Sequence, residues 1–201
     1  SFASAGLLTN ILLSKYADHL PLYRQEQIFK VRHGVELSRK TMCDWVWSLA
    51  HQLAMIYESL RTEIRSSGYL QADETPVSYQ NPGNGKCGTG YLWTYRARGC
   101  GVLFEWYPSR ASDCLTQMLS TFRGQLQSDG YAGYEAFYSK PQNHALRDQV
   151  ERAGCWAHAR RKFHEAREGS PLAVQVLADI QKLYRIEAEL REQKADDAVR
   201  L

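Results

Sequence analysis

The chain has 201 residues, of which 44% are hydrophobic and 23% charged, and its formal net charge is +3 at pH 7. These values are typical of a globular protein with one large or two small domains, and such a small net charge is no argument for nucleic-acid binding by the chain as a whole. No apolar run approaches membrane-spanning length, and the N-terminal segment lacks the basic region and cleavage site of a signal peptide. The five cysteines have no disulfide-framework spacing. We therefore expect a protein of the reducing cytoplasm.

Both ends of the sequence resemble cuts within a longer protein. The chain begins with Ser1 instead of Met, and it stops at Leu201 within a charged, helix-like run. We therefore expect further residues on both sides.

The first third of the chain has apolar residues at helical spacing and no strand-like alternation. Gly34 is suited to the left-handed position that ends a helix, and Ser38 is a favourable N-cap for the next one. The pattern predicts helices over residues 7–13, 20–32 and 38–64.

The last of these helices opens with Arg39, Lys40 and Thr41. A helix, a short glycine-containing turn and a second helix with a basic start are typical of a helix-turn-helix, whose second helix contacts DNA bases or phosphates. An ordinary helical hairpin with a solvated basic end has the same pattern. Both interpretations remain open at this point.

After residue 66 the apolar period changes to that of strands and short helices. Three antiparallel strands followed by alternating helix and strand predict a mixed α/β sheet of the ribonuclease-H-like arrangement. The expected strands are 69–79, 90–97, 101–107, 124–129 and 151–158, and the expected helices are 109–122, 132–139, 159–168 and 172–201. The glycine-rich segment 81–90 is predicted to be a hairpin loop.

Two aspartates occupy notable places in this sheet. Asp73 lies within the first strand and Asp129 ends the fourth, which should lie parallel to the first if a helical crossover joins them. Adjacent buried carboxylates repel each other unless a cation lies between them, and hard oxygen ligands favour Mg²⁺ or Mn²⁺. Such ions promote phosphodiester chemistry. The alternative is that both residues form turns, since aspartate before Gly130 is a common turn signal.

Other side chains are candidates for support of this site. Glu74 should face the opposite side of the strand from Asp73, where it supports the site or is solvated. Cys155 and His158 are too few for a zinc site without a second pair, so we expect hydrogen-bonded support or a core position. Tyr131 and Tyr134 could brace the loop after Asp129 or stack on a base.

A basic run opens the predicted helix that follows His158. It consists of Arg160, Arg161 and Lys162. Because arginine forks fit phosphates, these residues are candidates for DNA contact. The alternative is a solvated helix face.

Several long phrases resemble one known family. They include "SKYADHLPLYRQEQIF", "GVELSRKTMCDWV", "ADETPV", "SDGYAGY" and "CWAHARRKF". The sequence resembles the large transposase of the insertion-sequence-sixty-six family of bacterial elements, which is a DDE transposase. The resemblance extends over nearly the whole chain.

The resemblance implies a helical DNA-binding region (1–66) and a ribonuclease-H-like catalytic core (67–201). Asp73 and Asp129 match the first two acids, and Cys155 and His158 match a Cys-x-x-His element that supports the site. The family's third acid, a glutamate in an Asn-Asn-x-x-Glu-Arg context, has no match, so we expect it beyond Leu201 and expect this chain alone to be inactive.

The same resemblance implies function and partners. The expected activity is Mg²⁺- or Mn²⁺-dependent cleavage of element ends and their transfer to target DNA. It also implies a homo-oligomer on paired ends, element-encoded helper proteins and a location at the bacterial nucleoid. The alternatives are a non-catalytic DNA-binding module and a nuclease of the same fold without strand transfer.

Overall fold

The computed structural model describes residues 3–81, 83 and 85–196. The chain divides into two compact units, Ser1–Ser59 and Leu60–Leu201. The boundary falls within the helix α4 (Ala54–Ser66). Within the described ranges, no helix is both long and apolar enough to cross a membrane.

The first unit is helical, as predicted. Its helices are α1 (Ala5–Tyr16), α2 (Leu22–His33), α3 (Arg39–Gln52) and the start of α4. Gly34 ends α2 with a φ of 64°, and the Ser38 hydroxyl accepts a hydrogen bond from the Thr41 N–H at 3.1 Å. Both predicted helix boundaries are therefore confirmed.

The prediction of one continuous helix over 38–64 is wrong. The structure interrupts it at Leu53, between α3 and α4. Main-chain hydrogen bonds from Leu53 to Leu49 and from Tyr57 to Leu53 continue on both sides, so the interruption is confined to one residue. No Gly or Pro marks this position, and apolar periodicity alone therefore gave no signal for it.

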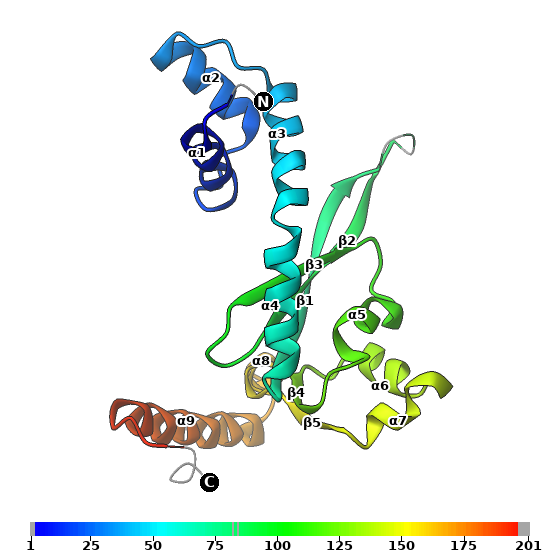
Figure 1. Ribbon diagram of the computed structural model, residues 1–201. Coiled ribbons are helices and arrows are strands. Elements are labelled where there is room, and N and C mark those ends of the chain that lie inside the picture. Colours follow the sequence, from blue (N-terminus) through cyan, green and yellow to red (C-terminus); the bar gives the residue numbers. More distant parts are fainter. Residues whose placement is uncertain (1–2, 82, 84, 197–201) are drawn as a thin grey trace. The chain divides into compact units, whose positions relative to one another are not determined.

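The second unit is built on a five-stranded mixed sheet (Figure 1). The strand order is β3-β2-β1-β4-β5, in which β1 pairs antiparallel with β2 and parallel with β4. The expected parallel neighbours are thus confirmed, and the α/β class with them. The strands are β1 (Tyr69–Gln80), β2 (Cys87–Arg96), β3 (Val102–Tyr107), β4 (Gly124–Ser128) and β5 (Val150–Gly154).

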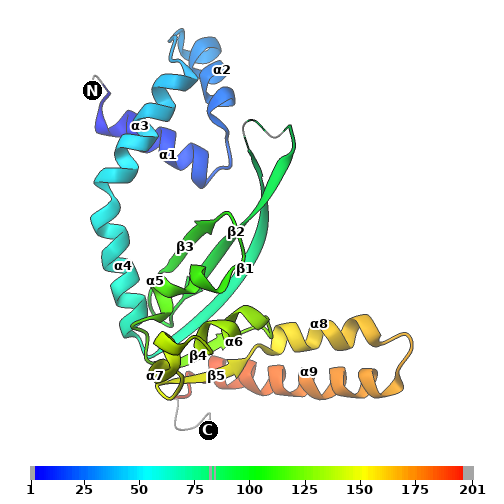
Figure 2. The same ribbon diagram turned by 90° about the vertical axis from the view of Figure 1, so that its right-hand side faces the viewer.

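Helices and 3-10 turns connect β3, β4 and β5, and two further helices follow β5. The elements are η1 (Ser112–Leu115), α5 (Thr116–Leu119), α6 (Ala132–Tyr138), η2 (Pro141–Asn143), α7 (His144–Arg147), α8 (Trp156–Ala166) and α9 (Pro171–Glu192). Figure 2 shows α8 and α9 side by side as an antiparallel hairpin.

Four predicted element boundaries are wrong. The expected helix over 109–122 is only the short η1–α5 pair, whose side chains Cys114, Leu115, Met118 and Leu119 turn into the core. The strand expected over 151–158 stops at Gly154, because its partner β4 stops at Ser128 and leaves no further ladder. The loop expected over 81–90 already belongs to β2 from Cys87. The helix expected to run to Leu201 ends at Glu192, and residues 197–201 lie outside the described ranges.

Alternation along β1 separates two faces of the sheet. Leu70, Ala72 and Glu74 are buried, on the side where Tyr134 of α6 meets Trp93 of β2 edge to face, with ring centroids 6.1 Å apart. The intervening residues of β1 are at least partly exposed. We call their side the open face, and define it by Tyr69, Gln71, Asp73, Thr94 and Gln127.

Candidate active site

The strand register brings Asp73 and Asp129 together on the open face. The parallel ladder pairs Gln71 with Gln127, and each aspartate lies two residues further along its own chain segment. Because side chains alternate with period two, the two carboxylates occupy neighbouring positions on the same face. The ladder between β4 and β5 pairs Gln127 with Ala153. Cys155 lies two residues after Ala153, and so it occupies the position next to Asp129.

A cavity of about 250 Å³ joins these positions. It is lined by Asp73, Asp129, Cys155 and His158, together with Thr94 and Arg96 of β2, Gln71 and Ala72 of β1, and Gln127 and Ser128 of β4. His158 belongs to the first turn of α8, directly after β5. The structure therefore gathers in one cavity four side chains that lie up to 85 residues apart in sequence.

The hydrogen bonds of the two carboxylates are local. Asp73 Oδ1 accepts the N–H of Glu74 at 3.1 Å and lies 3.8 Å from Nε2 of His158. Asp129 Oδ1 accepts the N–H of Tyr131 at 2.9 Å. These bonds orient each carboxylate relative to the chain segment that follows it.

The expectation that the metal-site aspartates are buried is wrong for Asp73, whose side chain is 55% exposed. The buried acid is its neighbour Glu74, which is only 1% exposed. The Arg110 guanidinium compensates it, donating from Nε to Glu74 Oε1 at 2.7 Å. The suggestion that Glu74 is solvated is therefore also wrong. Its position on the face opposite Asp73 is confirmed.

Burial dominates the electrostatics of Glu74. It raises the pKa of this carboxyl above its ordinary value, while the hydrogen bond and charge of Arg110 act in the opposite direction. The charges of Asp129 and Asp73 raise the pKa further. Arg110 therefore offsets part of the cost of burying this carboxyl.

The donor set at the cavity fits a hard divalent cation only in part. Asp73 and Asp129 offer the carboxylate oxygens that Mg²⁺ and Mn²⁺ prefer. His158 Nδ1 is buried and has no hydrogen-bond partner among residues 3–81, 83 and 85–196. In the same ranges no group of three or more His, Cys, Asp or Glu could hold a metal ion. The cavity thus offers two carboxylates, and no third acidic, histidine or cysteine side chain among the described residues is placed to join them as a metal ligand.

Cys155 and His158 are linked through the start of α8. The Cys155 carbonyl accepts the N–H of His158 at 3.1 Å, and Cys155 is a free thiol. This one-turn spacing turns both side chains towards the cavity.

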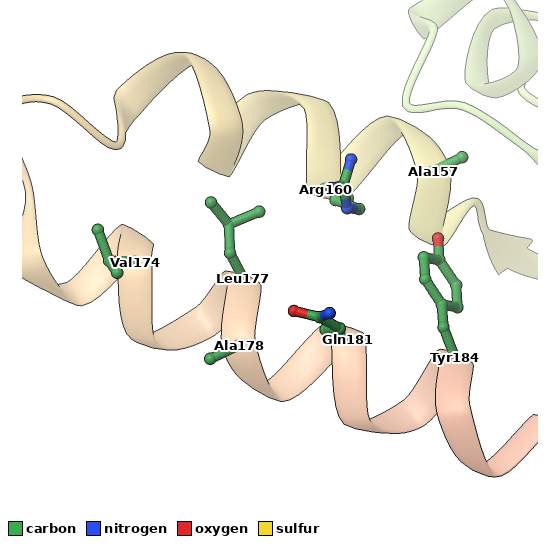
Figure 3. Close-up of a pocket in the computed structure, with 7 residues that line it drawn as sticks. All are labelled: Ala157, Arg160, Val174, Leu177, Ala178, Gln181 and Tyr184. Carbon is green, nitrogen blue, oxygen red and sulfur yellow. The ribbon is translucent and has the colours of Figure 1, made fainter.

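The three basic residues of α8 have different surroundings. Arg161 and Lys162 follow His158 by three and four residues and so share its helix face, where Lys162 also pairs with Glu165 at 3.4 Å. Arg160 instead lines a groove of about 630 Å³ between α8 and α9, together with Leu177 and Tyr184 (Figure 3). Only two of the three basic side chains therefore lie on the same helix face as His158.

In the first unit, the basic start of α3 is held by ion pairs. Arg39 bonds Glu26 of α2 through its side chain, with Nε 3.0 Å from Oε2, and through its N–H. Lys40 pairs with Asp44 at 2.8 Å, and Thr41 completes the Ser38 cap. The side chains of Arg39 and Lys40 are 65% and 85% exposed, so a polyanion could reach them.

Arg110 was not predicted from the sequence. The residue lies between β3 and η1, in a segment expected to begin a helix, and its partner Glu74 is 36 residues away. A buried carboxylate in β1 was itself a signal that a cation must lie nearby, but the sequence did not indicate which one.

One known protein family matches the chain over its full length. Residues 1–201 match the Transposase IS66 family. Uncharacterized protein y4qI of Sinorhizobium fredii is 36% identical over 195 residues, which are 92% of this chain and 36% of that protein. Uncharacterized protein y4jD of the same organism is 33% identical over 207 residues, covering 97% of this chain and 40% of that protein. The chain spans less than half the length of these relatives, and it belongs to the IS66 family of transposases.

Proposed function

We propose that this chain is the DNA-binding and catalytic part of a DDE transposase that cleaves insertion-sequence ends and joins them to target DNA. The observation that carries the proposal is the register of β1 and β4, which brings Asp73 and Asp129 to neighbouring positions beside one cavity. The strand order, with three antiparallel strands followed by two parallel ones, supports assignment to the ribonuclease-H-like fold.

In this proposal Asp73 and Asp129 hold Mg²⁺ or Mn²⁺, and a glutamate beyond Leu201 completes the set. The bound ion would help to activate a water molecule or 3′-hydroxyl and stabilise the leaving oxygen. His158 Nε2 lies 3.8 Å from Asp73 Oδ1, which is beyond hydrogen-bond distance, so His158 would act on this carboxylate only after a small shift of the side chain. Cys155, which follows β5, would support the site as part of the cavity wall. Glu74 would support it from the buried face of β1, where it pairs with Arg110.

The partners proposed are the element ends and target DNA. Arg161 and Lys162 would contact phosphates next to the cavity, and Arg160 would contact DNA only from the separate groove between α8 and α9. Residues 1–66 would act as a separate DNA-binding domain, with Arg39, Lys40 and Thr41 at the start of a recognition helix. Assembly as a homo-oligomer on paired ends, helper proteins and a place at the bacterial nucleoid complete the proposal.

Metal binding tests the site directly. Mn²⁺ binding by the 201-residue chain, followed by electron paramagnetic resonance, is expected to weaken at least tenfold in Asp73→Asn and in Asp129→Asn, because each removes an oxygen ligand. Asp179→Asn, which changes an exposed acid of α9 paired with Lys182, is the control and should bind as the unchanged chain does. Mn²⁺ affinities in Asp73→Asn and Asp129→Asn equal to that of the unchanged chain would contradict the metal site.

DNA binding tests the basic surface. Replacing both Arg161 and Lys162 by glutamine should weaken binding to duplex DNA and reduce the slope of log K against log salt by about 1–2, because each lost phosphate contact releases about one counterion fewer. The control is Lys182→Gln on α9. An unchanged salt slope in the double variant would show that this helix face does not contact DNA.

A further inference from the structure

The Arg110 guanidinium lies at the centre of a small cluster beneath the open face. Its Nε and one terminal nitrogen both donate to Oε1 of Glu74. Its guanidinium carbon lies 3.7 Å from the ring centroid of Tyr131, which is a close cation–π contact. The Tyr131 hydroxyl in turn donates to the Arg110 carbonyl at 2.5 Å. Arg110 and Tyr131 are thus joined twice, through side chain and main chain.

Each end of this cluster adjoins one of the two aspartates. Glu74 follows Asp73 and donates its N–H to that carboxylate, while Tyr131 donates its N–H to Asp129. The contacts therefore form a continuous path from one aspartate through Glu74, Arg110 and Tyr131 to the other.

The cluster lies where main-chain pairing stops. The ladder between β1 and β4 ends at the pair Gln71 and Gln127, two residues before either aspartate. Beyond that point the loop after Asp129 is connected to β1 through Arg110. The ion pair between Glu74 and Arg110 is not needed for core stability alone, since two well-packed apolar residues often stabilise a core as well as a buried ion pair does.

We propose that Glu74, Arg110 and Tyr131 form a brace that sets the position of the Asp129 carboxylate relative to Asp73, with Arg110 as the positioning residue. The proposal rests on the proposed function of these two carboxylates as metal ligands. It assigns to Arg110 an indirect role, since its contacts run to the segments that carry the aspartates.

The test separates positioning from simple stability. In Arg110→Gln the buried Glu74 loses its partner, so general destabilisation would obscure the result. The double variant Glu74→Met/Arg110→Met removes the charges together and restores an apolar fit. Hydrogen exchange of the Tyr131 amide, measured by NMR in the metal-free 201-residue chain, reports the Asp129 loop directly. Urea unfolding of the same sample reports global stability.

The expected result is that unfolding of the double variant resembles that of the unchanged chain while the Tyr131 amide exchanges at least tenfold faster. Mn²⁺ binding should weaken about 10–100-fold, as is typical when the groups that orient metal ligands are removed. The matched control replaces the ion pair of Asp113 and Lys140 by two methionines. It should leave both the exchange of the Tyr131 amide and the binding of Mn²⁺ unchanged.

Two outcomes distinguish the proposals. Unchanged protection of the Tyr131 amide in the double variant would overturn the brace, whatever happens to Mn²⁺. Mn²⁺ binding that does not respond to Asp73→Asn or Asp129→Asn would instead overturn the proposed metal site, while the exchange measurement would still decide whether the brace exists. Tyr131→Phe, which removes only the hydroxyl bond to Arg110, should show a smaller rise in exchange in the same direction.

Discussion

Replacement of Asp129 by asparagine is expected to slow cleavage at the element ends by about a thousandfold or more in a protein that contains the complete acidic set. Metal ions contribute several kcal/mol of transition-state stabilisation to phosphodiester chemistry, and about 4 kcal/mol corresponds to a thousandfold in rate. Asparagine retains the size of the side chain and an oxygen that can accept the Tyr131 N–H. The loss is therefore expected in the chemical step, with the fold intact.

The measurement is single-turnover cleavage of a labelled duplex carrying the element end, in the version of the protein extended beyond Leu201. Asp179→Asn is the control for the loss of one negative charge elsewhere. Strand transfer from pre-cleaved ends separates a transposase from a nuclease of the same fold, which would give no joined product. Duplex binding without metal-dependent cleavage would favour the non-catalytic module.

Replacement of Gly124 by alanine should have the largest effect on folding. Gly124 opens β4 with a φ of 119°, a conformation that side chains other than glycine rarely adopt. An added Cβ would lie 2.1 Å from the carbonyl oxygen of Gly68, which accepts the Gln125 N–H at 2.9 Å. Backbone strain and overpacking together should lower the free energy of unfolding by about 2–6 kcal/mol.

Urea unfolding measured by circular dichroism provides the test. Gly154→Ala is the matched control, because this glycine also belongs to the sheet but has open space around its Cβ position. Its unfolding midpoint should stay close to that of the unchanged chain. Equal stability of Gly124→Ala and the unchanged chain would show that β1 and β4 do not approach as closely as described.

The sheet could be predicted because its signals are local. Alternating apolar residues and short links indicated the antiparallel strands, and the crossover rule placed β4 beside β1. Asp73 and Asp129 were found in the same way, since each stands at a definable point of a strand. Topology makes β1 and β4 neighbours, and the register between them, which only the structure shows, brings the two aspartates side by side.

The rest depended on contacts between distant parts of the chain. Arg110 meets Glu74 across 36 residues, and nothing in its own segment marks it. Burial was assigned to Asp73 because a strand contains two adjacent acids, and periodicity alone does not show which of them faces the core. The register with β2, which pairs Glu74 with buried Trp93 and Asp73 with half-exposed Thr94, decides it.

Because of its two adjacent acids, β1 cannot shift its register by one residue without exchanging their positions. A slip of one residue would turn Asp73 towards the core and Glu74 towards the open face, since the side-chain period is two. The shorter aspartate would then have to satisfy Arg110, and the longer glutamate would enter the row of Asp129. Single-residue insertions or deletions between Gly68 and Asp73 should therefore be selected against. Substitutions on the open face of the same segment leave the strand register unchanged.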